Sequence, residues 1–192
     1  MKNHISLYLE RLIETLSCME VLKAEQLGFA LLKAWRQGNS IYLCGNGGSA
    51  GNAIHLANDL IFGTGIKFGK GLRVEALSAN PAVLTCLAND IGYDQIFAEQ
   101  IRVKGRSGDV LIALSGSGNS SNILKALEIG NELGLVTFAI LGFDGGKAKN
   151  LAQHPIHIPV QDMQIAEDLQ LIIGHICMQW LCENPPSKSN DE

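Results

Sequence analysis

The sequence predicts an α/β fold: a doubly wound, five-stranded parallel sheet flanked by helices, with a helical arm at the N-terminus. Five short segments along the chain are rich in aliphatic and β-branched residues, and segments with helical spacing of apolar residues separate them. The five segments are almost continuously apolar, which is typical of strands buried on both faces. Strands that alternate with helices in this way form parallel sheets covered by helices on both sides.

The expected elements can be placed along the chain. The strands are expected at 40–45, 72–77, 109–114, 136–141 and 154–160. The helices are expected near 48–61, 81–89, 93–102, 119–133, 145–152 and 164–182. Before them, apolar residues recur at helical spacing from Ile5 to about Trp35 without a proline, which predicts one or two long helices. Right-handed crossovers limit the strand order, but the pattern alone does not give it.

The length and composition suit a single domain. The chain has 192 residues, of which 46% are hydrophobic, and this is enough to form one substantial core. We expect a helical arm over 1–38, a core domain over 39–183 and a disordered tail over 184–192. The tail is polar and contains two prolines, which break a helix. The apolar stripe of the arm can cap the core or pair with a partner subunit.

The charge and the cysteines narrow the class of partner and the compartment. The formal net charge is -4, and the lysines and arginines are scattered, so we expect no nucleic-acid partner. No apolar run approaches the roughly 20 residues of a membrane span, so we expect no membrane association. The five cysteines form no C-x-x-C pair, and most have apolar neighbours. These features predict a cytoplasmic protein with a small molecule or another protein as partner.

Two glycine- and serine-rich loops follow expected strands, "GNGGSA" at 45–50 and "SGSGNSS" at 115–121. In open α/β sheets, ligands bind beyond the carboxyl ends of the strands, where backbone N–H groups and helix N-termini meet. Neither loop contains the lysine of a nucleotide-binding P-loop. Neutral donors and helix dipoles suit a phosphate ester. Each loop alone can be an ordinary turn before a helix, and the pair together favours phosphate binding.

Two helices carry candidates for proton transfer or metal binding. His55 and Asp59 stand four residues apart, so they share one face of the helix after the first loop. On the last helix, Glu167 and Asp168 precede His175 by eight and seven residues. Spacing alone fits simpler interpretations as well: a histidine packed beside an exposed acid, acids favoured by the helix dipole, and a core histidine among isoleucines.

Four segments taken together resemble a known family. They are "LCGNGGSAGNAIHLANDL", "LANDIGYDQIF", "LIALSGSGNSSNILKAL" and "AEDLQLIIGHI". Alone, Asn89 and Asp90 before Gly92 are explained by ordinary helix-ending turn chemistry. As an ordered set, the four segments resemble the phosphoheptose isomerases of the sugar isomerase (SIS) domain superfamily. The resemblance spans nearly the whole chain and implies a flavodoxin-like sheet.

The resemblance implies a site for a sugar phosphate and a second cluster for chemistry. The substrate-binding residues that it implies are Asn46, Gly47, Gly48, Ser49, Asn89, Asp90, Ser115, Gly116, Ser117 and Ser120. The residues that it implies for zinc coordination are His55, Asp59, Glu167 and His175, and among these Asp59, Glu167 and His175 are implied to transfer protons. The family pattern has Glu where this chain has Asp59 and Gln where it has Glu167. It also has an Arg soon after the first site helix, where this chain has none before Arg73.

The implied reaction is an aldose-ketose isomerisation. Sedoheptulose 7-phosphate would be converted through an enediol to D-glycero-D-manno-heptose 7-phosphate, on the route to the heptose of bacterial lipopolysaccharide. The family resemblance also implies a homotetramer whose sites form between subunits, with the arm as an interface element. Two alternatives stay open: a non-catalytic SIS module that binds a sugar phosphate or a protein, like the initiator-associating proteins of DNA replication, or an isomerase of another sugar phosphate.

Overall fold

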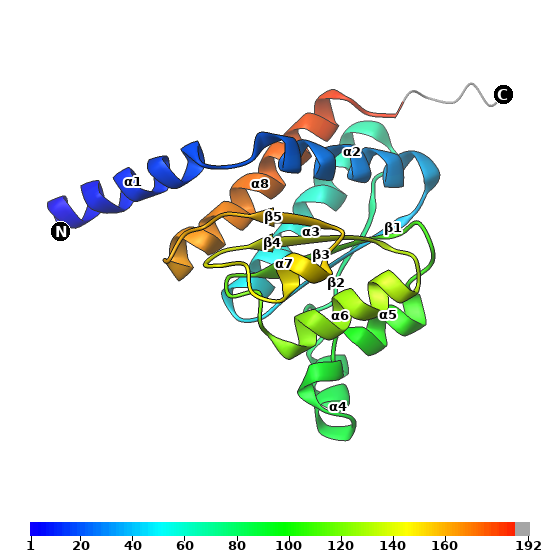
Figure 1. The fold of residues 1–192 in the computed structure, drawn as a ribbon. Coiled ribbons are helices and arrows are strands. Elements are labelled where there is room, and N and C mark those ends of the chain that lie inside the picture. The colour runs from blue at the N-terminus through cyan, green and yellow to red at the C-terminus, as the bar shows by residue number, and fades with distance from the viewer. Residues whose placement is uncertain (187–192) are drawn as a thin grey trace.

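The computed structural model describes residues 1–186, apart from the side chain of Lys67. Its centre is one sheet of five parallel strands in the order β2-β1-β3-β4-β5. The strands are β1 (Ser40–Gly45), β2 (Arg73–Ala76), β3 (Val110–Ser115), β4 (Val136–Leu141) and β5 (His154–His157). The expected α/β class with five parallel strands is therefore confirmed (Figure 1).

The helices flank this sheet and cover both of its faces. They are α1 (Lys2–Ser17), α2 (Val21–Gln37), α3 (Gly48–Phe68), α4 (Pro81–Asp90), α5 (Ala98–Lys104), α6 (Ser121–Glu132), α7 (Ala148–Leu151) and α8 (Met163–Glu183). A 3-10 turn at Tyr93–Gln95 stands before α5. The expected N-terminal helical region is thus two helices, and the expected helix near 93–102 is a 3-10 turn followed by α5.

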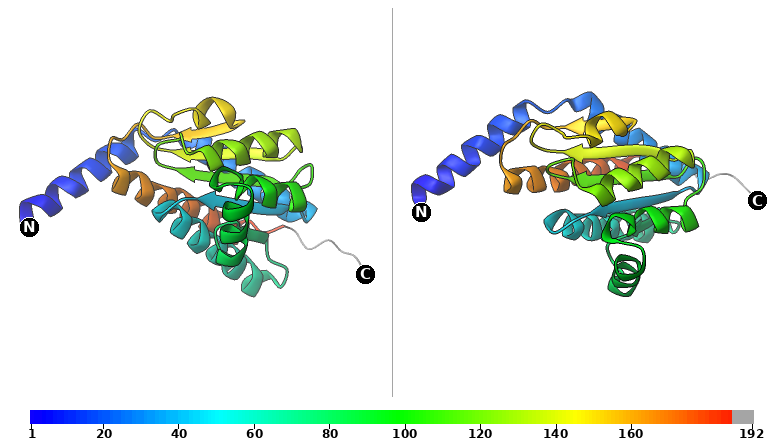
Figure 2. Two further views of the ribbon diagram at one scale, coloured as in Figure 1. Left: turned by 90° about the horizontal axis from the view of Figure 1, so that it is seen from below. Right: turned by 60° about the horizontal axis from the view of Figure 1, so that its bottom comes forward.

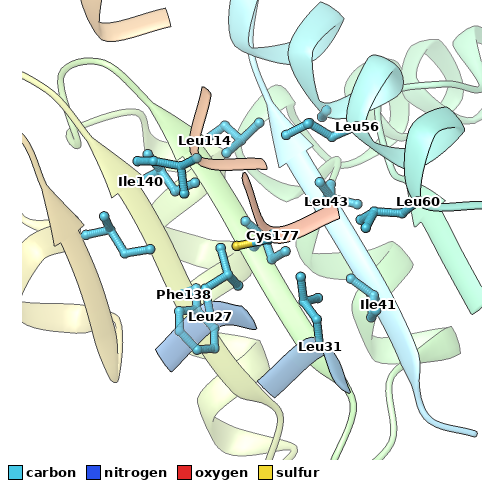
Figure 3. Packing of buried hydrophobic residues seen from close by; sticks show 14 of the residues in the cluster. Leu27, Leu31, Ile41, Leu43, Leu56, Leu60, Leu114, Phe138, Ile140 and Cys177 are labelled. Atoms are coloured by element: carbon cyan, nitrogen blue, oxygen red, sulfur yellow. The ribbon is translucent and has the colours of Figure 1, made fainter. Parts of the chain in front are cut away.

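The strands alternate their side chains between two cores. Ile41 and Leu43 of β1 point to a core that α2, α3 and α8 complete, and Figure 3 shows this packing with Leu27, Leu56 and Cys177. The neighbouring β1 side chains point to a second core, which α5 and α6 cover. The three central strands β1, β3 and β4 are almost entirely buried because helices cover both of their faces, and the doubly wound interpretation is confirmed.

Helix α3 is longer than the sequence pattern predicts. We expected it to end near residue 61, whereas it continues to Phe68 through a stretch with two glycines. A Cβ at Gly63 would lie 3.1 Å from Met178 Sδ of α8, and Gly65 stands against Gly71. The hydroxyl of Thr64 donates to the Leu60 carbonyl. Tertiary packing at these small residues therefore outweighs their low helix propensity.

Helix α7 is shorter than predicted, for a local reason. We expected a helix over 145–152, but α7 is a single turn at Ala148–Leu151. Gly145 and Gly146 adopt φ values of 84° and 52°, which lie in the left-handed region. A right-handed helix cannot include those values, so it begins only after them.

Helix α1 contacts the first core only through the partly buried side chains of Tyr8, Leu12 and Leu16. It has no buried residue, and it extends away from the sheet in both views of Figure 2. The Tyr8 hydroxyl donates to Asp168 of α8, and Arg11 pairs with Asp162 at 2.8 Å. Helix α2 instead belongs to the first core.

Within residues 1–186, no helix is long and apolar enough to span a membrane. Most of the tail predicted to be disordered, 187–192, lies outside the described residues.

Candidate active site

The two predicted loops meet at the point where the strand order reverses. Strands β1 and β3 are neighbours, with Gly45 paired to Leu114, and each continues to a strand on the opposite side. This is the switch point at which open α/β sheets bind ligands. A cavity of about 260 Å³ lies there. It is lined by Asn46, Gly47, Gly48, Ser49, Leu114, Ser115, Gly116, Ser117, Ser120, Met163 and Glu167.

The lining brings together eight of the ten predicted substrate-binding residues. Helices α3 and α6 both begin at this cavity, so their free N–H groups and positive dipole ends face it. Asn89 and Asp90 are the other two, and they stand at the exposed end of α4, where Asn89 donates to Asp90. They do not line the cavity, and their binding role stays a prediction.

Asn46 is held by two residues that sequence reasoning missed. Its side-chain amide exchanges two hydrogen bonds of 2.8 Å with Asn122 of α6, which is buried. The Tyr93 hydroxyl donates to Asn46 Oδ1 at 2.9 Å. This network joins the loop after β1 to the first turn of α6. Asn122 follows the second loop directly, but nothing in the local pattern shows that its partner lies 76 residues away.

The serines of the second loop order its backbone. Ser115 Oγ accepts from the Gly118 N–H at 3.1 Å, and Ser117 Oγ accepts from the Asn119 N–H at 3.3 Å. Ser120 occupies the N-cap position of α6 without a side-chain capping bond. Each of these hydroxyls therefore keeps its own hydrogen for another acceptor. The loop can offer three neutral donors to an anion.

Ser49 is connected to α8 through buried amides. Gln170 Nε2 donates to Ser49 Oγ at 3.0 Å, and Asn52 Nδ2 donates to Gln170 Oε1 at 3.0 Å. Asn52 Nδ2 also donates to the backbone carbonyl of Glu167 at 2.9 Å. Sequence reasoning missed both Asn52 and Gln170. Their partners in α3 and α8 are more than 100 positions apart in the chain, so no local pattern could have indicated them.

His55, Asp59 and His175 form one cluster. The two His Nε2 atoms lie 3.0 Å apart, and Asp59 Oδ2 lies 3.2 Å from each of them. Helix α3 supplies His55 and Asp59, and the adjacent α8 supplies His175. The Asp59 side chain is 20% exposed, whereas those of His55 and His175 are 49% and 38% exposed, so the cluster is open to a ligand. Two imidazoles and a carboxylate can hold a divalent metal.

Glu167 does not belong to this cluster in the structure. Its carboxylate lines the cavity and faces Gly48, where a Cβ atom would overlap both carboxylate oxygens. The groups of possible metal ligands among the described residues contain His55, Asp59 and His175 but not Glu167. The predicted roles of Glu167 in metal binding and proton transfer stay predictions.

The buried cysteines next to this region are structural. Cys44 ends the apolar part of β1, and burial raises the pKa of its thiol to about 12. Cys177 lies in α8 near His175, and burial raises the pKa of its thiol to about 12 as well. A thiol with so high a pKa stays protonated at neutral pH and is a poor nucleophile. These two cysteines therefore act as small hydrophobic residues.

A comparison with protein families assigns the chain to one class. Residues 3–142 match the SIS domain family, which is 140 of the 192 residues. A phosphoheptose isomerase from Clostridium acetobutylicum is 40% identical over 149 residues, 76% of this chain and 74% of that protein. One from Aneurinibacillus thermoaerophilus is 36% identical over 177 residues, 91% of this chain and 88% of that protein.

Solved structures agree with these relatives. The phosphoheptose isomerase of Neisseria gonorrhoeae superposes with a TM-score of 0.87 at 27% identity, covering 95% of this chain and 98% of that one. That of Francisella tularensis gives a TM-score of 0.84 at 25% identity over 96% and 98% of the two chains. The chain therefore belongs to the SIS domain family and, within it, to the family of phosphoheptose isomerases.

Proposed function

We propose that the protein is an aldose-ketose isomerase that converts sedoheptulose 7-phosphate to D-glycero-D-manno-heptose 7-phosphate. One observation carries the proposal: the cavity of neutral donors is lined in part by the first turns of α3 and α8, and the same two helices carry the His55–Asp59–His175 cluster. The cavity suits a phosphate ester, and the cluster suits proton transfer at a carbonyl. The names of the relatives support the same substrate.

The separation between the cavity and the His55–Asp59–His175 cluster suits a long sugar. Ser49 and His55 stand six residues apart on α3, which is a rise of about 9 Å at 1.5 Å per residue. Glu167 and His175 stand eight residues apart on α8, which is a rise of about 12 Å. In sedoheptulose 7-phosphate, the phosphate and the carbonyl lie at opposite ends of the carbon chain. With the phosphate in the cavity, C1 and C2 would reach the cluster.

The geometry supports Asp59 over Glu167 as the carboxylate that takes the carbon-bound proton. Its Oδ2 atom lies 3.2 Å from His175, whereas Glu167 faces the cavity. Asp59 would take the proton from C1 of the ketose, which leaves an enediol, and would return it to C2. His175 would move the hydroxyl proton between O1 and O2. The C1–H bond breaks and a C2–H bond forms, so the reaction needs no external oxidant or reductant.

The cluster also fits the zinc ion that the family resemblance implies. Two imidazole nitrogens and one carboxylate oxygen are the kinds of ligand that zinc takes in catalytic sites, where a further position stays open. His55, Asp59 and His175 would hold the ion; Glu167 faces the cavity, and its part as a further ligand, which the resemblance implies, stays a prediction. When bound, zinc supplies a positive charge that polarises the sugar oxygens.

The expected assembly and pathway belong to this proposal as well. Exposed apolar side chains form a stripe on α1 at Ile5, Leu9 and Ile13, and α3 exposes Phe62 and Ile66. Such surfaces support burial against other subunits, in line with the expected homotetramer. Sedimentation of the purified protein tests this assembly. A place in lipopolysaccharide synthesis and a cytoplasmic location stay predictions.

The substrate is tested by comparing sugar phosphates of different length. Purified protein supplied with zinc would be incubated with sedoheptulose 7-phosphate or with fructose 6-phosphate, and aldose formation followed. We expect a clear preference for the seven-carbon ketose. Equal or better turnover of the six-carbon ketose would favour another sugar phosphate isomerase. Binding without turnover of either sugar would favour the non-catalytic SIS module.

A further inference from the structure

The hydrogen bonds around Gln170 have only one possible direction. The amide of Asn52 faces the backbone carbonyl of Glu167 at 2.9 Å, and a carbonyl only accepts. The Asn52 atom there is therefore its NH2 group. The same NH2 group faces Gln170 at 3.0 Å, so the Gln170 atom on that side is its oxygen. The remaining Gln170 atom, which faces Ser49 Oγ at 3.0 Å, is then the nitrogen, and it donates.

This direction decides what the Ser49 hydroxyl does. A hydroxyl that accepts from Gln170 still has one hydrogen to donate. Among residues 1–186, the Ser49 side chain makes one hydrogen bond, in which its oxygen accepts from Gln170. No group of these residues therefore accepts the Ser49 hydrogen. Ser49 is 4% exposed and Gln170 is 1% exposed, so water competes little for either group. The free hydrogen belongs to a side chain that lines the cavity.

We propose that Gln170 is a positioning residue for substrate binding: by donating to Ser49 Oγ, it keeps the Ser49 hydroxyl available as a donor to the phosphoryl group of the bound sugar. Asn52 anchors the Gln170 amide in the orientation that this requires. The inference rests on the proposed function, in which the cavity holds the phosphate. A phosphate dianion offers only acceptors, so a hydroxyl in this position contributes only when it donates.

An isosteric substitution at Gln170 reverses the direction of the hydrogen bond with Ser49. In Gln170→Glu, an ionised carboxylate accepts from Asn52 as before but has nothing to donate to Ser49. The Ser49 hydroxyl then gives its only hydrogen to Glu and turns away from the phosphate. The loss of a hydrogen bond to a charged group predicts a Kd for sedoheptulose 7-phosphate that is raised by about tenfold to a hundredfold. The added negative charge also repels the phosphate, so the charge effect must be measured separately.

A double-mutant cycle separates donor direction from charge. The Kd for sedoheptulose 7-phosphate would be measured by calorimetry for the wild-type protein, Gln170→Glu, Ser49→Ala and the double variant. Repulsion acts with or without the Ser49 hydroxyl, whereas the reversed bond needs it. We expect Gln170→Glu to weaken binding much more in the wild-type background than in the Ser49→Ala background. We also expect kcat at saturating substrate to change little, because Gln170 acts on binding.

Two outcomes would overturn the inference but not the proposed function. They are unchanged binding by folded Gln170→Glu, and an equal loss of binding in both backgrounds. If the wild-type protein itself neither binds nor isomerises the sugar phosphate, the proposed function fails and the inference fails with it. Should Gln170→Glu not fold, Asn52→Ala tests the same series of hydrogen bonds by removing the amide that orients Gln170. It should raise Kd severalfold only when Ser49 is present, and an unchanged Kd would contradict the inference.

Discussion

The Nε2 atoms of His55 and His175 lie 3.0 Å apart, although 120 residues separate them in the chain. Asp59 Oδ2 lies 3.2 Å from each of them, so the carboxylate reaches both rings. The phosphoheptose isomerases, which the sequence resembles, have the longer Glu at the position of Asp59. In this chain, the shorter side chain still joins the cluster, and the two helices that carry it pack directly against each other. The structure therefore brings together the two imidazoles and the carboxylate to which the proposal assigns proton transfer.

The first prediction concerns His175. Removing an acid/base group that acts in proton transfer typically costs a factor of about 10² to 10⁴ in rate. His175→Ala should therefore lower kcat by about that factor while sugar phosphate binding at the cavity is largely kept. Steady-state kinetics and calorimetry measure the two effects. His4→Ala, an exposed histidine on α1, is the matched control and should leave both unchanged. Full activity of His175→Ala would show that its assigned role is wrong.

The second prediction concerns metal binding by the cluster. His55→Ala and Asp59→Asn each remove one of the three ligand groups, so both variants should lose most of their zinc after dialysis. Atomic emission of the dialysed protein gives the zinc content per chain. His154→Ala is the control, because that histidine stacks on Phe138 in β4, away from the cluster. Equal zinc content in Asp59→Asn and the wild-type protein would remove Asp59 from the ligand set.

The third prediction concerns Glu167, where the resembled family has Gln. The Glu167 carboxylate lines the cavity that would hold the phosphate, and two negative groups in one cavity repel each other. Glu167→Gln should therefore lower KM for the sugar phosphate severalfold. It should keep kcat and zinc content, because Asp59 and the histidines form the cluster without it. A large fall in kcat would instead identify Glu167 as the base, and loss of zinc would identify it as a ligand.

The fourth prediction compares two glycines of α3. A Cβ at Gly48 would overlap the Glu167 carboxylate, so Gly48→Ala must displace that side chain and narrow the cavity. We expect a raised KM. At Gly51, three residues further along the same helix, a Cβ would meet no atom within 4 Å. Gly51→Ala should keep KM and raise the free energy of unfolding by about 0.5–1 kcal/mol. Equal KM values for the two variants would contradict the assigned cavity.

The fifth prediction concerns the anchoring of α1. The hydrogen bond to Asp168 raises the pKa of Tyr8 to about 12 in the folded protein, from an ordinary value of about 10. Folding thus favours the protonated phenol. Its contribution to stability is fully present below about pH 10 and is lost as the pH rises through about 12.

Denaturant unfolding of the wild-type protein and Tyr8→Phe at several pH values measures this contribution. The wild-type protein should be more stable by a constant amount up to about pH 10, and the difference should then shrink. A stability difference that stays the same throughout the alkaline range would contradict the role of the Tyr8 proton.

The sequence predicted the parts of this molecule that local chemistry controls. Strands β1 and β4 agree with their predicted bounds because continuous runs of buried aliphatic residues mark them. The two loops were identifiable as a candidate site because both are rich in glycine and serine and both follow expected strands, although each alone also fits an ordinary turn. The end of α3 was predicted wrongly, since contacts with α8 stabilise a glycine-containing turn that propensity disfavours.

Long-range pairing is the part that the pattern could not give. Nothing near Gln170 indicates that it donates to Ser49, which is 121 residues away. The same is true of Asn46 and Asn122. The spacing of His55 and Asp59 showed a shared face, but that His175 completes the cluster was implied only by the family resemblance. The orientation of Glu167 toward Gly48 depends on how α3 and α8 pack, which no local pattern encodes.

The most direct test of the central claim is proton exchange during turnover. Protein supplied with zinc would be incubated with sedoheptulose 7-phosphate in deuterium oxide and followed by NMR. The enediol route predicts an aldoheptose 7-phosphate that carries deuterium at C2, and Asp59→Asn should abolish this signal. If folded protein that binds both zinc and the sugar phosphate gives neither the aldose nor deuterium in the ketose, the isomerase assignment is contradicted.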